Sequence, residues 1–188
     1  CTYLECAELI ESYPWKHWKN IDAKPDYANI KIEAVDIWHF IMSQGLEDYK
    51  RGNLGSIETL ANNINSLANF STFSGEIQET FKDYYEQIAV VEVIMKTIFC
   101  GGSTEKLMAA FIDVAVQSGL NLDALYKLYV GKNILNQFRQ DHGYKEGTYL
   151  KIWNGEEDNV TMQGILEENE NVSPEGLYKA LEEAYPKS

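Results

Sequence analysis

The chain has 188 residues and a formal net charge of −13, from 29 acidic and 16 basic residues. Such an acidic excess argues against broad binding of nucleic acid or of an acidic membrane surface. No apolar stretch reaches the roughly 18 residues that a membrane-spanning helix needs. Three cysteines form no metal or redox motif, which favours a reducing cytosol. We therefore expect a cytoplasmic protein that is long enough to bury a hydrophobic core.

The chain opens inside an apolar pattern at Tyr3 and Leu4, without an initiator Met and without a capping residue. A helix normally begins at a side chain that accepts a hydrogen bond from its first turn. We therefore expect that Cys1 is not the biological N-terminus and that a functional segment precedes it.

Hydrophobic periodicity predicts helices along the whole chain and no convincing strand. The predicted helices span 1–12, 30–50, 57–70, 76–100, 105–118 and 123–141. Ser103 is a candidate N-cap. The polar helix at 57–70 is expected to be peripheral or mobile, and the acidic segment 160–188 to be a solvated helical tail. The predicted fold class is all-α.

Two pairs of carboxylates stand out in the first two helices. Glu5 and Glu8 form one pair, and Glu33 and Asp36 form the other, each three residues apart. Members of a pair share a helix face. Such a pair is ordinarily a solvated face, but the mostly apolar residues around both pairs predict buried helices. Buried carboxylates are costly unless a positive group lies among them, and all-oxygen ligands favour Mg²⁺, which typically acts on phosphates.

Basic and amide side chains gather between residues 131 and 159 of this otherwise acidic chain. Lys132, Asn136 and Arg139 lie on one stripe of the last core helix. One reading is a solvated stripe that pairs with acidic neighbours. The other is an anion site facing the metal cluster, in which Lys and Arg bind phosphate oxygens and Asn binds a base edge or ribose.

These segments resemble those of the dimeric all-α dUTPases, a branch of the all-α nucleoside triphosphate pyrophosphohydrolases. The matching segments are Glu5–Ile10, Trp15–Lys19, Ile32–Phe40, Gly131–Lys145 and Gly147–Asn159. The resemblance implies one helical-bundle domain over 1–188, whose active-site core comprises 1–44 and 121–159. The stretch 45–120 carries no family signature and is expected to form a partly mobile helical lobe.

The resemblance further implies a homodimer that hydrolyses dUTP to dUMP and pyrophosphate with two or more Mg²⁺ ions, with dUDP as a further candidate substrate. Glu5, Glu8, Glu33 and Asp36 match the metal ligands, and Glu5 or Glu8 would also orient or deprotonate the attacking water. Phe40 matches a ring that packs against the deoxyribose, where a 2′-hydroxyl would clash. The cationic clamp on the phosphate chain is matched by Lys132, Arg139, Lys145 and Lys151. Asn136 matches a nucleoside contact, and Tyr144 is a further substrate-binding residue. The segment expected to help hold uracil lies upstream of Cys1.

Three alternatives stay open at this point. The first is a pyrophosphohydrolase of the same fold for another nucleotide, which the 131–159 motifs disfavour. The second is a di-iron carboxylate bundle suggested by Asp36 and His39, but that class needs a second such motif on another helix. The third is a non-catalytic acidic interaction protein, in which the buried acids would have no rationale.

Overall fold

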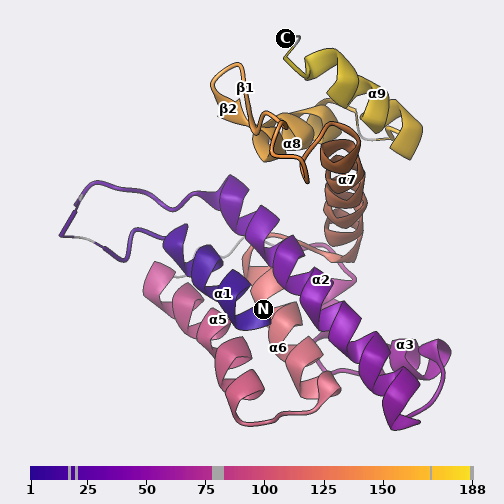
Figure 1. The fold of residues 1–188 in the computed structure, drawn as a ribbon. Coiled ribbons are helices and arrows are strands. Elements are labelled where there is room, and N and C mark those ends of the chain that lie inside the picture. Colours follow the sequence, from indigo (N-terminus) through magenta and orange to yellow (C-terminus); the bar gives the residue numbers. More distant parts are fainter. Residues whose placement is uncertain (17, 20, 78–82, 170, 187–188) are drawn as a thin grey trace. The chain divides into compact units, whose positions relative to one another are not determined.

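The computed structural model describes residues 1–16, 18–19, 21–77, 83–169 and 171–186. Nearly all of the regular secondary structure in the described chain is helical (Figure 1), which confirms the predicted all-α class. It divides into two compact units, Cys1–Leu125 and Tyr126–Ser188. None of the described helices is both long enough and apolar enough to cross a membrane.

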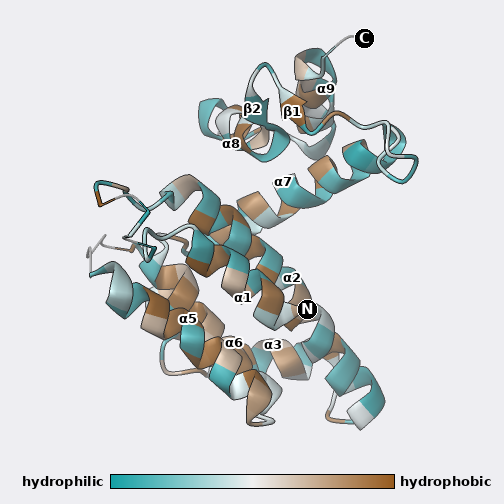
Figure 2. Ribbon diagram, turned by 60° about the vertical axis from the view of Figure 1, so that its left-hand side comes forward, coloured by the Kyte–Doolittle hydropathy of each residue, from teal (hydrophilic) through white to brown (hydrophobic). Residues whose placement is uncertain are grey.

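The regular secondary structure that the structure describes in the first unit consists of helices. They are α1 (Thr2–Glu11), α2 (Tyr27–Gly52), α3 (Ile57–Asn65), α4 (Phe70–Phe73), α5 (Tyr84–Phe99), α6 (Thr104–Gln117) and the start of α7 (Leu122–Asp141). Helix α1 packs against α2 and α5, and α6 packs against α2 and α5 (Figure 1). Hydrophobic residues run along α5 and α6 in Figure 2.

The contact between α2 and α6 is close because the sequence provides a small residue at the crossing. A Cβ atom added to Gly45 would lie 2.8 Å from the Met108 Cε atom, so a larger residue there would displace the end of the Met108 side chain. Further along the same contact, the Trp38 and Phe111 rings stack with centroids 5.0 Å apart. Tight packing of this kind fixes the position of α2, the helix that carries two of the predicted metal ligands.

Local capping explains where several helices begin and end. The Asp26 carboxylate accepts a hydrogen bond from the Asn29 backbone N–H at 3.0 Å and starts α2. The helix ends at Gly52 and is capped by Asn53, whose φ of 53° is left-handed. The Ser103 hydroxyl accepts from the Lys106 N–H, which confirms the predicted N-cap of α6.

Two helix boundaries differ from the prediction. The single helix expected at 57–70 is divided, because α3 ends at Asn65 and α4 occupies Phe70–Phe73. The Asn69 amide donates hydrogen bonds to the Ala109 carbonyl and to the Asp113 carboxylate, both at 2.8 Å, so contacts to α6 replace helix continuity here. Helix α5 begins at Tyr84 rather than at residue 76, capped by the Asp83 side chain. Residues 78–82 of the predicted helix lie outside the described residues.

The second unit contains a short hairpin that the sequence did not predict. Strands β1 (Ile152–Trp153) and β2 (Glu156–Glu157) pair antiparallel. The turn consists of Asn154 at φ 53° and Gly155 at φ 93°. Two successive positive φ angles in an Asn-Gly pair are typical of a tight hairpin turn, so the expectation of no strand was wrong.

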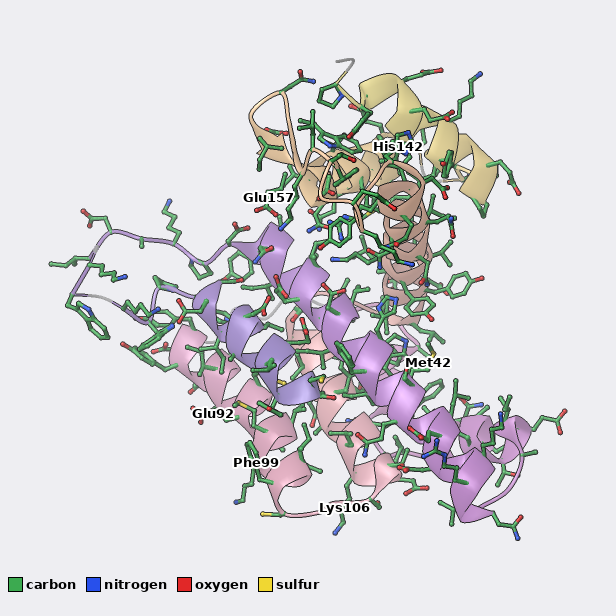
Figure 3. The ribbon with its side chains drawn as sticks, in the orientation of Figure 1. Met42, Glu92, Phe99, Lys106, His142 and Glu157 are labelled. Carbon is green, nitrogen blue, oxygen red and sulfur yellow. The ribbon has the colours of Figure 1, made fainter. Side chains whose placement is uncertain are left out.

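Rings fill the core of the second unit. The Phe138 ring lies 5.4 to 5.6 Å, between centroids, from the rings of Trp153, Tyr178 and Tyr185. Helices α8 (Asp158–Glu168) and α9 (Pro174–Ala184) pack on each other. Leu177 and Leu181 of α9 are buried, so the expectation of a solvated tail was wrong for this face. Figure 3 labels His142 and Glu157 in this unit.

Candidate active site

Three of the four predicted acidic ligands come together in the first unit. One carboxylate oxygen from each of Glu5, Glu8 and Glu33 lies within 4.8 Å of the others. The packing of α1 against α2 brings them together, because Glu5 and Glu8 are one turn apart on α1 and Glu33 lies on the neighbouring helix. We call these three residues the glutamate cluster.

Asp36, the fourth predicted ligand, is not a member of this cluster within the described residues. It lies one turn after Glu33 on α2 and is half-buried. The sequence therefore identified both helices of the cluster, whereas the structure groups three of the four acids.

The cluster is more accessible than the sequence suggested. Glu5 and Glu33 are half-buried and Glu8 is exposed. Leu4 of α1 is 51 % exposed, so α1 is not surrounded by apolar contacts as predicted. Helix α2 is closer to the expectation, with buried residues all along it, yet Phe40 is 39 % exposed. Both Glu8 and Phe40 are thus accessible to a ligand.

Asn29 holds the Glu33 side chain in place through hydrogen bonds. The Asn29 amide donates to the Glu33 carboxylate at 3.3 Å and to the Ser12 hydroxyl at 2.8 Å, which links the end of α1 to α2. A cavity of about 360 Å³ opens beside Glu8, and Ser12 and Asn29 are among its lining residues. Asn29 was missed from the sequence, because an amide in the first turn of a helix carries no signal of this contact.

The cysteine within α1 is chemically quiet. Cys6 is completely buried, and burial, with a smaller contribution from the charge of Glu5, raises the pKa of its thiol to about 12. The thiol therefore stays protonated at neutral pH and is a poor nucleophile. His39 also lies outside the glutamate cluster in the described residues, and one of its ring nitrogens contacts the Val35 carbonyl at 2.9 Å. This geometry does not support a di-iron site.

In the second unit, Arg139 forms a two-pronged ion pair with Asp158. Its Nε donates to Asp158 Oδ2 at 2.8 Å and its Nη2 to Oδ1 at 2.7 Å. The Tyr149 hydroxyl donates to the same carboxylate at 2.7 Å. Burial lowers the pKa of Arg139, but the hydrogen bonds and charge of Asp158 outweigh it and the net shift is upward. The guanidinium therefore stays charged.

The other predicted substrate-binding residues of this unit differ in exposure. Lys132 is only 5 % exposed, whereas Tyr144 is 52 % exposed. Lys145 is exposed, and the Lys151 ammonium pairs with Glu157 at 3.5 Å. Asn136 is half-buried, and its Oδ1 accepts a hydrogen bond from Arg139 Nη1 at 3.1 Å.

Asp158 and Tyr149 were not singled out from the sequence, although both lie in the segment 147–159 that carries the resemblance. Asp158 occupies the first position of α8, where an acid is ordinarily explained by the helix dipole. Nothing in the sequence pattern indicates that this acid is fully buried.

An all-α fold that brings carboxylates together from adjacent helices is typical of the all-α nucleoside triphosphate pyrophosphohydrolases. A family model described as dUTPase matches residues 1–144. The chain belongs to the dUTPase family, and its activity is the hydrolysis of dUTP to dUMP and pyrophosphate. The match includes the glutamate cluster, Asp36 and Tyr144, whereas Lys145 and Lys151 lie beyond it. A search of curated proteins found no match.

Proposed function

We propose that this dUTPase acts with Mg²⁺ held by the glutamate cluster, with Asp36 completing the ligand set. Enzymes of this family generally use Mg²⁺. The observation that carries the proposal is the approach of three carboxylate oxygens to within 4.8 Å of one another. Two oxygens on opposite sides of one Mg²⁺ lie about 4.2 Å apart, twice the usual Mg–O distance. The cluster therefore fits a hard cation after small side-chain adjustments.

The residues of the first unit have separable tasks in this proposal. A bound Mg²⁺ would neutralise charge on the phosphate oxygens and lower the pKa of a coordinated water. Glu8 is the most exposed acid of the cluster, which suits it to orient or deprotonate the attacking water, with Glu5 as the alternative. Asn29 holds the Glu33 carboxylate in place through its 3.3 Å hydrogen bond.

Phe40 supports selection of a deoxyribose. It follows Asp36 by four residues and Glu33 by seven, so all three share one side of α2. Its ring is 39 % exposed and is available to pack against a sugar. A 2′-hydroxyl would collide with a ring held at this point, which accounts for selection against UTP.

The phosphate chain and the nucleoside would be bound by residues of the second unit. We assign Lys132, Lys145 and Lys151 to phosphate oxygens and Asn136 to the nucleoside. Arg139 and Tyr144 complete the substrate-binding set. The net charge of −13 makes these cations valuable for a polyanionic substrate and argues against nucleic acid as a partner. We also propose that the enzyme acts as a homodimer.

The test is pyrophosphate release from dUTP, dCTP, dTTP and UTP at a fixed Mg²⁺ concentration, repeated with EDTA. The proposal expects a strong preference for dUTP and loss of turnover in EDTA that added Mg²⁺ restores. Comparable turnover of all four nucleotides would favour the general pyrophosphohydrolase, and full activity in EDTA would contradict the metal site.

A further inference from the structure

The ion pair with Asp158 leaves Arg139 little capacity to bind a phosphate chain. A guanidinium carries five N–H groups. Four of them are already used in hydrogen bonds, two to Asp158, one to Asn136 and one to Asn159. The Arg139 side chain is only 12 % exposed. A residue occupied in this way is suited to hold its neighbours in place.

The neighbour that Arg139 orients is Asn136. Arg139 Nη1 donates to Asn136 Oδ1 at 3.1 Å. Because a guanidinium has no acceptor, the amide atom that faces it must be the oxygen. The NH₂ group of Asn136 is therefore turned away from Arg139. Within the described residues this NH₂ group makes no hydrogen bond, and the half-buried side chain leaves it accessible.

We infer that Asp158 is a positioning residue which, through Arg139, fixes Asn136 as a hydrogen-bond donor toward the nucleoside of the substrate. This inference rests on the proposed function, in which Asn136 lies beside the nucleoside. A fixed donor selects an acceptor oxygen, which is either a uracil carbonyl or the 3′-hydroxyl of the sugar. The 4-position of uracil carries a carbonyl acceptor, whereas the amino group there in cytosine can only donate. A donor fixed at that position distinguishes dUTP from dCTP.

The first test is Asp158→Asn, with kcat and KM measured for dUTP, dCTP and the 3′-deoxy analogue of dUTP. The substitution keeps the shape of the side chain and removes the charge that holds Arg139, so Asn136 becomes free to turn. We expect KM for dUTP to rise about tenfold, which is what losing one hydrogen bond costs, while kcat changes less than about threefold. If Arg139 instead binds phosphate directly, releasing it leaves KM unchanged or lower, and that result would overturn the inference.

The second test leaves the buried ion pair between Arg139 and Asp158 intact. It therefore tests the role of Asn136 even if Asp158→Asn does not fold. Asn136→Asp keeps an acceptor for Arg139 and presents a second acceptor to the substrate. If the 4-carbonyl of uracil is read, the ratio of kcat/KM for dUTP over dCTP falls about tenfold or more. If the sugar is read, dUTP and dCTP lose equally and the 3′-deoxy analogue is unaffected. Wild-type kinetics with all three nucleotides would contradict both readings.

Asp141→Asn is the matched control. Asp141 lies on α7, as Asn136 and Arg139 do, but its carboxylate accepts hydrogen bonds from Gln137 and Tyr178 instead. Its kinetic constants should stay at the wild-type values. The proposed metal site is tested separately, because Glu8→Gln should lower kcat for every nucleotide. Unchanged kcat in Glu8→Gln would contradict the metal site, whereas failure of the inference about Asp158 would leave that result unaltered. Asp158→Asn should retain the wild-type dependence on Mg²⁺ concentration.

Discussion

The glutamates of the cluster differ in their exposure to water, and this difference separates their tasks. Glu5 and Glu33 are half-buried, and Glu33 is held by Asn29, whereas Glu8 is exposed. A ligand whose side chain is already fixed loses little conformational entropy when a cation binds. We therefore propose that Glu5 and Glu33 are the pre-positioned cation ligands, while Glu8 both completes the ligand set and handles the water.

At Phe40 we predict that Phe40→Ala weakens discrimination between dUTP and UTP. Removal of the ring opens space for a 2′-hydroxyl, so the ratio of the two kcat/KM values should fall about tenfold or more, as for other steric pockets. Phe99→Ala is the control, because Phe99 is 70 % exposed at the end of α5 (Figure 3). Equal ratios for Phe40→Ala and the wild type would remove Phe40 from the site.

The three cysteines should react with iodoacetamide at different rates at pH 8. Cys1 and Cys100 are exposed and Cys6 is buried, and burial raises the pKa of the Cys6 thiol to about 12. Because the thiolate is the reactive form, we expect two labels per native chain by mass spectrometry and a third after denaturation. Rapid labelling of Cys6 in the native protein would show that α1 is not packed as described.

At the scale of elements, one hydrogen-bonded chain joins α2, α3 and α6. The Tyr49 hydroxyl donates to the Glu105 carboxylate at 2.7 Å, and the Asn63 amide donates to the Tyr49 oxygen at 2.6 Å. The hydrogen bond from Tyr49 is the main reason that the pKa of Glu105 is lowered. The junction therefore stabilises the fold most when Glu105 is ionised.

This junction predicts a stability loss in Tyr49→Phe that depends on pH. A carboxyl whose folded-state pKa lies below its unfolded value adds stability above the unfolded pKa and loses it as pH falls through the folded pKa. The difference in the free energy of unfolding between wild type and Tyr49→Phe should thus be largest near pH 7 and shrink below pH ~4. Urea unfolding at several pH values measures it, with Tyr126→Phe, an exposed tyrosine, as control. A difference that stays constant with pH would exclude Glu105 as the partner.

Elements with strong local signals could be predicted from the sequence, and those fixed by tertiary contacts could not. Helices α1, α2, α6 and α7 carry long apolar periodicity, and Ser103 caps α6 as predicted. The division between α3 and α4 depends on Asn69 contacting α6, which no local pattern encodes. The Asn-Gly pair at Asn154 and Gly155 is a sequence signal for a hairpin turn, although the prediction here was a loop. The spacing of Leu177 and Leu181 by four residues likewise indicates a buried helix face, although the prediction was a solvated tail.

At the scale of the whole molecule, the predicted site residues divide between the two units. The glutamate cluster, Asp36 and Phe40 belong to Cys1–Leu125, and the predicted cations belong to Tyr126–Ser188. Spacing along a helix predicted the pairing of Glu5 with Glu8. The approach of Glu33, the exclusion of Asp36 from the cluster and the burial of Asp158 follow from packing between helices, which the spacing alone does not specify.

The most direct test of the central claim compares Glu8→Gln with Glu11→Gln. Both glutamates lie on α1, but Glu11 is outside the cluster and pairs with Lys16. Pyrophosphate release from dUTP is measured across a Mg²⁺ titration, with the melting temperature recorded at each concentration. We predict that Glu8→Gln loses about 10³-fold or more in kcat and most of the Mg²⁺-induced rise in melting temperature, while Glu11→Gln behaves as wild type. Wild-type turnover and an unchanged Mg²⁺ response in Glu8→Gln would contradict this prediction.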